Sequence, residues 1–126
     1  MFDLSDKIAI ITGASQGIGR TMALVFAESG ANVICVARSE SKIKELCLDI
    51  TNKGGLAHAI ACDVGDGDAF GNTIKSVTDE HGKLDILINN AGITRDSLLM
   101  RMNDAQWNDV IQTNLKGAFH GMRSAI

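Results

Sequence analysis

The short apolar run Lys7-Ile8-Ala9-Ile10-Ile11-Thr12 leads directly into the glycine-rich stretch Gly13-Ala14-Ser15-Gln16-Gly17-Ile18-Gly19. A continuous apolar run of this length is typical of a strand that is buried on both faces of a parallel sheet. The residues that follow, up to Ser29, predict a helix that ends at Gly30 and whose buried face is Ile18, Met22, Val25 and Phe26. A glycine-rich turn between a strand and a helix favours phosphate binding, because the first N–H groups of the helix are unpaired there.

Strands and helices continue to alternate along the rest of the chain. Further strands are predicted at Asn32–Ala37, Leu56–Cys62 and Leu84–Ile88, and further helices at Glu40–Asn52 (with Ser39 as N-cap), Asp66–His81 and Asp104–Ile126. Regular alternation predicts β-α-β units, and therefore an α/β fold with a Rossmann-like, doubly wound parallel sheet. Such a sheet normally continues past its fourth strand, and the last helix ends within an apolar pattern. We therefore expect the chain to be truncated after about four strands.

Composition narrows the function classes. The chain has 126 residues, 45% of them hydrophobic and 21% charged, which suits one small globular domain over residues 1–126. A net charge of −3 with interspersed acids and bases argues against a nucleic-acid partner. The stretch Met1–Lys7 has no long apolar segment, and no run is long enough to span a membrane, so a cytoplasmic protein without a membrane partner is expected.

Cysteine and histidine usage points away from metal binding. Cys35, Cys47 and Cys62 are odd in number and lack C-x-x-C spacing, which predicts buried free thiols in a reducing compartment. The three histidines are scattered along the chain, and no metal site is predicted.

The three glycines of the first turn have separate predicted uses. Gly13 allows the sharp turn, Gly17 lets a pyrophosphate approach the backbone, and Gly19 lets the helix pack close to the strand. The simpler alternative is a turn that only requires positive φ angles. A P-loop is excluded, because no Gly-Lys-Ser/Thr follows.

The spacing Gly-x-x-x-Gly-x-Gly, together with Asn89-Asn90-Ala91-Gly92, resembles the short-chain dehydrogenase/reductase family. The resemblance covers the whole chain. Its most specific part is Ile93–Met102, which is similar to the family members that reduce 3-oxoacyl-[acyl-carrier-protein] in fatty-acid biosynthesis.

The resemblance implies a strand order and a set of cofactor-binding residues. The third and second strands would lie on one side of the first strand, with the fourth on the other. Gly13–Gly19, in particular Ser15, Gln16 and Ile18, would line the pyrophosphate and ribose pocket. Asp63 and the Val64 backbone would hold the adenine, and Asn90, Ala91 and Gly92 would pass the ribose nearest the nicotinamide.

Simpler structural interpretations exist for the polar residues of this set. Asp63 could be an N-cap or turn aspartate before the third helix, and Asn89 and Asn90 could only close a turn. Asp85 is assigned to structure.

The end of the second strand bears on the choice of cofactor. An NAD enzyme places an acid there to bind the ribose 2′-OH, whereas this chain has Ala37 followed by Arg38. A guanidinium can bind a 2′-phosphate through two bonds, so NADP(H) is the predicted cofactor. The alternative is that Arg38 is an ordinary solvated arginine, and many similar reductases have a base where Gln16 stands.

Asn114 is the remaining catalytic candidate. The last helix has a predicted apolar stripe that includes Asn114 and comprises Trp107, Val110, Ile111, Leu115, Ala118 and Met122, with Trp107 as its anchor. An amide on that stripe needs partners, and the backbone could supply them. The resemblance implies instead that the backbone carbonyl of Asn114 anchors a water in the proton relay to the catalytic lysine.

The family's chemistry uses a Ser and a Tyr-x-x-x-Lys pair, and this chain contains no Tyr. The resemblance therefore implies the NADP-binding part of a 3-oxoacyl-[acyl-carrier-protein] reductase, expected to be inactive alone and tetrameric as the parent enzyme. Three alternatives stay open: a non-catalytic dinucleotide-binding or interaction module, a dehydrogenase for another carbonyl or alcohol substrate, and a methyltransferase. The absence of an acid after Ala37 argues against the last.

Overall fold

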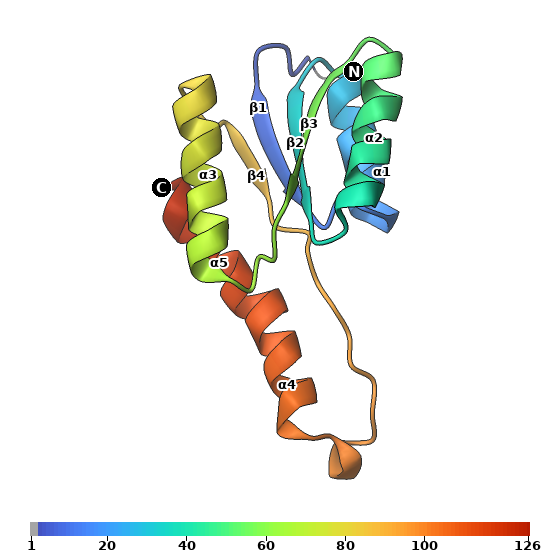
Figure 1. The fold of residues 1–126 in the computed structure, drawn as a ribbon, viewed down its shortest axis with the longest axis vertical. Helices are drawn as coiled ribbons and strands as arrows, with labels where there is room; N and C mark the ends of the chain where they lie inside the picture. Colours follow the sequence, from blue (N-terminus) through green and yellow to red (C-terminus); the bar gives the residue numbers. More distant parts are fainter. Residues whose placement is uncertain (1–2) are drawn as a thin grey trace.

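The computed structural model describes residues 3–126, so Met1 and Phe2 of the N-terminal stretch lie outside the described residues. Strands and helices alternate through the first four strands (Figure 1), and a run of helices then follows the last strand. The elements are β1 (Ile8–Thr12), α1 (Gly17–Glu28), β2 (Asn32–Ala37), α2 (Glu40–Asn52), β3 (Leu56–Ala61), α3 (Gly67–His81), β4 (Ile86–Ile88), the 3-10 turn η1 (Leu99–Arg101), α4 (Asp104–Val110), the π-helix η2 (Ile111–Lys116) and α5 (Gly117–Ala125).

The sheet is parallel, with the strand order β3-β2-β1-β4. Ile10 in the middle of β1 pairs with Ile34 of β2 on one side and Leu87 of β4 on the other. All of β1 is buried, as the continuous apolar run predicted, whereas β4 is only half-buried throughout. The Rossmann-like α/β fold and its strand order are therefore confirmed. β3 ends one residue earlier than predicted, and β4 begins two residues later.

Helices cover both faces of the sheet, which gives two separate cores. In Figure 1, α1 and α2 lie on one side of the sheet, and α3 and α5 lie on the other. Successive residues of β1 point to opposite cores: Ile11 packs with residues of α1 and α2, and Ile10 packs with Phe70 and Ile74 of α3. This alternation between two apolar surfaces explains why β1 contains no exposed position.

The buried face of α1 differs from the predicted one. Its buried residues are Gly19, Ala23 and Ala27, whereas Ile18 is 73% exposed and Val25 is 48% exposed. The reason is the short distance between α1 and the first turn, since a Cβ added at Gly19 would lie 2.3 Å from the Gly13 carbonyl oxygen. Small residues face the sheet because only they fit there. Of the predicted face, Met22 and Phe26 are half-buried and pack against the same core, whereas Ile18 and Val25 do not.

The predicted stripe of the last helix is only partly correct: Val110, Ile111 and Ala118 are half-buried, whereas its other three apolar side chains are exposed. Trp107, Leu115 and Met122 are 59%, 63% and 53% exposed, and the buried residues of α5 are Gly117 and Gly121. Two causes combine. The π-helical turn η2 shifts the helical register between α4 and α5, and α5 packs so closely that a Cβ on Gly121 would lie 2.9 Å from a ring carbon of Phe70. Trp107 lies before η2, on α4, which extends away from the sheet (Figure 1), so it does not anchor the helix.

Polar contacts fix several element ends. Asp66 caps α3 by accepting a hydrogen bond from the Ala69 N–H, whereas Ser39 occupies the N-cap position of α2 without a side-chain bond. Asp85 accepts hydrogen bonds from the Ile8 N–H at 2.8 Å and from Lys83 Nζ at 3.0 Å, which confirms its structural assignment. The bond from Ile8 and, after it, the one from Lys83 lower the pKa of Asp85.

Cys35, Cys47 and Cys62 are buried and free, as predicted. Among residues 3–126, no helix combines the length and the apolar character that a membrane span requires.

Candidate functional site

A cavity of about 410 Å³ opens at the carboxyl ends of the four strands. In a parallel sheet whose strand order reverses, as it does here between β1 and β4, ligands bind at this edge. The predicted site residues that line the cavity are Gly13, Ser15, Gln16, Gly17, Arg38, Asp63, Val64, Asn90, Ala91 and Gly92. Ala14, Ile18 and Gly19 were also predicted but do not line it, and the lining adds Val36, Ala37, Ser39, Cys62, Ile93 and Thr113.

The Thr12 hydroxyl joins the end of β1 to the end of β4 and to the cavity-lining residues that follow it. Thr12 is 1% exposed, and its Oγ1 donates to the Ile88 carbonyl oxygen at 3.2 Å. The same oxygen accepts hydrogen bonds from the N–H groups of Asn90 and Ala91, both at 3.0 Å. Sequence reasoning did not assign Thr12 to the site. The available signal was a hydroxyl at the end of an otherwise apolar strand.

Two glycines let the first turn approach the loop that follows β4. Gly13 has φ +65°, and a Cβ built there would lie 2.8 Å from the Ala91 Cα. A Cβ on Gly19 would lie 2.5 Å from Asn90 Nδ2, which itself donates to the Gly13 carbonyl oxygen at 3.2 Å. Asn90 thus holds the turn as well as lining the cavity, and both glycines serve close packing.

Gly17 and the start of α1 face the open part of the site. Gly17 has φ +60°, and a Cβ there would meet no atom within 4 Å. The N-cap residue Gln16 makes no side-chain cap, and the first turn of α1 contains no acid. The first N–H groups of α1, which as in any helix lack intrahelical partners, are therefore not satisfied by a capping side chain, and the positive end of the helix dipole is not compensated locally. This arrangement suits an anion such as a pyrophosphate.

Arg38 and Asp63 follow β2 and β3 at the rim. Arg38 is exposed and takes part in none of the ion pairs formed within residues 3–126. Asp63 Oδ1 accepts a hydrogen bond from the Gly65 N–H at 2.9 Å. Asp63 is therefore a turn aspartate, and the helix N-cap is Asp66 instead. Beside it, burial raises the pKa of the Cys62 thiol, which keeps that group neutral near pH 7.

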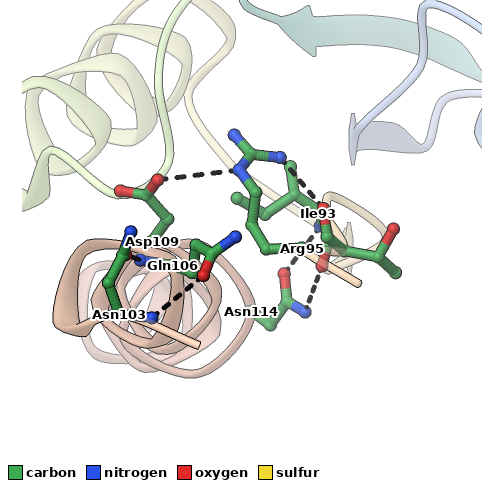
Figure 2. Close-up of polar contacts among 7 residues, drawn as sticks. Ile93, Arg95, Asn103, Gln106, Asp109 and Asn114 are labelled. Atoms are coloured by element: carbon green, nitrogen blue, oxygen red, sulfur yellow. Dashed lines mark hydrogen bonds and ion pairs between the residues drawn. The ribbon is translucent and has the colours of Figure 1, made fainter. Parts of the chain in front are cut away.

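Asn114 does not occupy the core position that was predicted for it. Its side chain is exposed and bonds twice to one residue of the loop after β4 (Figure 2). Asn114 Oδ1 accepts from the Ile93 N–H at 2.8 Å, and Nδ2 donates to the Ile93 carbonyl oxygen at 2.9 Å. The shifted register of η2 moves Asn114 off the buried face. The backbone of Ile93 satisfies the amide, but at an exposed position and not in the core. The role implied for the Asn114 backbone carbonyl stays a prediction.

A second contact ties the same loop to α4. The guanidinium of Arg95 lies 3.6 Å from an Asp109 carboxylate oxygen (Figure 2), and Arg95 also donates to the Thr94 carbonyl oxygen at 3.0 Å. The start of α4 is fixed by a reciprocal capping box between Asn103 and Gln106. The cavity therefore has one wall supported by the apolar core and another held mainly by hydrogen bonds.

Comparison with known proteins agrees with this geometry. A family model described as short chain dehydrogenase matches residues 7–126. The chain is 49% identical over 120 residues to the 3-oxoacyl-[acyl-carrier-protein] reductase FabG of Staphylococcus aureus, covering 94% of this chain and 49% of that protein. It is 48% identical over 113 residues to the FabG of Vibrio harveyi, covering 90% and 45% respectively. The chain thus spans about half the length of these relatives.

Solved structures match over a similar share. A short-chain type dehydrogenase/reductase from Mycobacterium marinum superimposes with a TM-score of 0.93 at 38% identity, over 98% of this chain and 50% of that one. A metagenomic short-chain oxidoreductase in complex with NADP gives a TM-score of 0.92 at 36% identity, over 95% and 55%.

Proposed function

The chain belongs to the short-chain dehydrogenase/reductase family, and from this premise we propose that residues 1–126 form the NADP(H)-binding part of a reductase. The proposed reaction of the whole enzyme is NADPH-dependent reduction of 3-oxoacyl-[acyl-carrier-protein] to the 3-hydroxyacyl form. The substrate proposal is supported by the names of the relatives that are 48–49% identical. A cytoplasmic homo-oligomer is the proposed form of that enzyme.

The observation that carries the cofactor proposal is the position of Arg38. Arg38 lines the same cavity as Gly13 and Gly17, and it directly follows the end of β2, where an acid would favour NAD. Its guanidinium is exposed and is not engaged by any acid of residues 3–126. A 2′-phosphate at this rim would meet a free cation that can bind it through two hydrogen bonds.

The remaining lining residues fit the other parts of a dinucleotide. The uncapped N-terminus of α1 beside Gly17 would face the pyrophosphate. The Asp63 side chain, whose Oδ2 makes no hydrogen bond within the described chain, would face the adenine. The nicotinamide ribose would be bordered by Asn90 and Ala91, whose N–H groups donate to Thr12, and by the adjacent Gly92.

When bound, NADPH would supply the hydride. The alkoxide that results must be protonated, and a positioned general acid contributes roughly 10²- to 10⁴-fold to such a step. The 126 residues contain no Tyr, and the amide of Asn114 is not an acid near neutral pH. We therefore propose that the chain binds the cofactor and that reduction requires residues beyond these.

A binding comparison tests the cofactor proposal. The chain should bind NADPH more tightly than NADH, and Arg38→Ala should remove most of that margin, because a bidentate charge-assisted contact is worth roughly ten- to a hundredfold in affinity. Arg101→Ala, which removes an exposed arginine of η1 outside the cavity, is the matched control. Fluorescence titration measures both ratios. An unchanged ratio in Arg38→Ala would refute the cofactor assignment.

A turnover assay separates the substrate alternatives. NADPH oxidation is followed with a 3-oxoacyl thioester, for the chain alone and for the chain continued with the second half of its 49%-identical relative. The proposal expects turnover only in the second case. Turnover with other carbonyl substrates alone would favour a different dehydrogenase, and cofactor binding without any turnover would favour a non-catalytic module.

A further inference from the structure

The π-helical turn η2 lies between the two loops that border the cavity. Three consecutive residues of η2 contact three different parts of the site: the turn after β3, the cavity and the loop after β4. Gln112 Nε2 donates a hydrogen bond to the Gly65 carbonyl oxygen in the turn after β3. Thr113 lines the cavity, and Asn114 makes its two bonds to Ile93 in the loop after β4.

The contact with the β3–α3 turn depends on the π geometry. Gln112 and Gly117 are five residues apart, which is the i→i+5 hydrogen-bond spacing of a π-helix. Both pack against the same turn: a Cβ built on Gly65 would lie 3.1 Å from Gln112 Cγ, and one built on Gly117 would lie 2.7 Å from Val64 Cγ2. In an α-helix with 3.6 residues per turn, two such positions would point roughly 140° apart. The π turn is therefore what brings both residues onto Val64 and Gly65.

The turn that Gln112 holds carries a side chain of the cavity. Asp63 lines the cavity, and its Oδ1 is bonded to the Gly65 N–H, so the direction of the carboxylate follows the backbone of Gly65. His120 supports the same turn, with Nδ1 3.4 Å from the Val64 carbonyl oxygen. Gln112 itself does not line the cavity, so any effect on a ligand passes through Asp63 and the turn.

We propose that Gln112 is a positioning residue of the cofactor site. We also propose that η2 fixes the position of the loop after β3 relative to the loop after β4, which are the two borders of the cavity. Gln112 fixes the turn that carries Asp63, on the side of the cavity proposed to bind adenine. Asn114 fixes Ile93, on the side proposed to bind the nicotinamide. The ligand part of this inference rests on the proposed function. The hydrogen bond from Gln112 to the Gly65 carbonyl oxygen, here called the brace, is present in the chain without ligand.

The first test therefore uses no cofactor. Gln112→Glu keeps the shape of the side chain but replaces its N–H donor with an acceptor, and Gln112→Met removes the donor without adding charge. Both should raise amide hydrogen exchange at Gly65 and Asp66 by roughly three- to tenfold, the effect of one lost hydrogen bond, and leave exchange at Ile93 unchanged. Asn108→Asp, an exposed amide-to-acid change on α4, is the matched control. Unchanged exchange at Gly65 in both variants would overturn the brace.

The second test asks whether the brace positions a ligand or only stabilises the fold. Affinities are measured by calorimetry for NADPH and for its two halves, 2′,5′-ADP and nicotinamide mononucleotide. Both Gln112 variants should weaken NADPH and 2′,5′-ADP about equally, by roughly three- to tenfold, and leave the mononucleotide unchanged.

The outcomes separate the two proposals. An equal loss for both halves, accompanied by a lower unfolding temperature, would mean a merely structural role and would overturn the positioning proposal. If the unsubstituted chain binds no NADPH, the proposed function and the positioning role both fail, while the exchange measurement still decides whether Gln112 braces the turn.

Discussion

The centre of the sheet and the β4–α5 side differ in how they are held. Every residue of β1 is buried, whereas every residue of β4 is half-buried, and only Gly117 and Gly121 are buried in α5. The first wall of the cavity rests on close-packed apolar side chains. The second is joined to it by polar contacts, chiefly Thr12 to the loop after β4 and Asn114 to Ile93. The comparison shows that one binding site can combine a wall set by packing with a wall set by hydrogen bonds.

The largest expected effect is on the stability of the centre. Ile10→Ala removes a fully buried side chain between two strands and should lower the free energy of unfolding by about 2–5 kcal/mol. Trp107→Ala deletes a larger side chain that is 59% exposed and should cost less than about 1 kcal/mol. Urea denaturation measures both. Similar losses for the two variants would remove the distinction between the regions.

A smaller effect is expected on association through the second region. Leu115, Phe119 and Met122 follow each other at helical spacing and are 63%, 51% and 53% exposed. Exposed apolar surface of this kind favours self-association at micromolar concentration. Replacing Phe119 and Met122 by Gln should weaken it by roughly tenfold or more, since burying such side chains stabilises a contact by about 1.5 kcal/mol or more each.

Sedimentation velocity over a concentration series measures this association. Leu48→Gln is the matched control, because Leu48 is 60% exposed on α2, on the opposite side of the sheet. A monomer at all concentrations, or an equal effect of Leu48→Gln, would contradict the assignment of the association to this face.

The smallest expected effect concerns the polar link between the regions at the start of β4. The pKa of Asp85 is lowered, first by the Ile8 N–H and then by Lys83, so its charged form stabilises the fold. This stabilisation is present above the unfolded pKa of about 3.9 and is lost as the pH falls through the lower folded value. Asp85→Asn should therefore flatten the fall in melting temperature below about pH 4. The exposed Asp79→Asn is the control, and a matching flattening there would contradict the assignment.

The sequence predicted the first region better than the second. The bounds of β2 and α2 agree with the prediction. β2 is an apolar run that follows Gly30, and α2 is an amphipathic segment that begins after Ser39 and ends before Gly54-Gly55. In α1, the apolar pattern was correct for Met22 and Phe26 but not for Ile18 and Val25, and Gly19, Ala23 and Ala27 are the residues buried against the sheet. The controlling factor there is the distance between helix and strand, which hydrophobic periodicity does not record.

In the candidate site, the residues at the strand ends were predicted from the sequence, and the contacts of the π turn were not. Residues next to strand ends, such as Gly13, Arg38, Asp63 and Asn90, line the cavity because parallel strands end at one edge. The placement of Asn114 and the contact of Gln112 were not predictable by helical periodicity. Both depend on the π turn, which moves every later side chain relative to a regular helix.

The hydroxyl of Thr12 also has a consequence for the order of folding. Its partners Asn90 and Ala91 lie 78 and 79 residues further along the chain. The pairs β1–β2 and β2–β3 join segments that are close in sequence, whereas β4 must return to the free edge of β1 after two of the three crossovers have formed. Closing such a long loop is entropically costly and slows folding. On the ribosome, the glycine-rich turn is complete only after the loop that follows β4 has emerged.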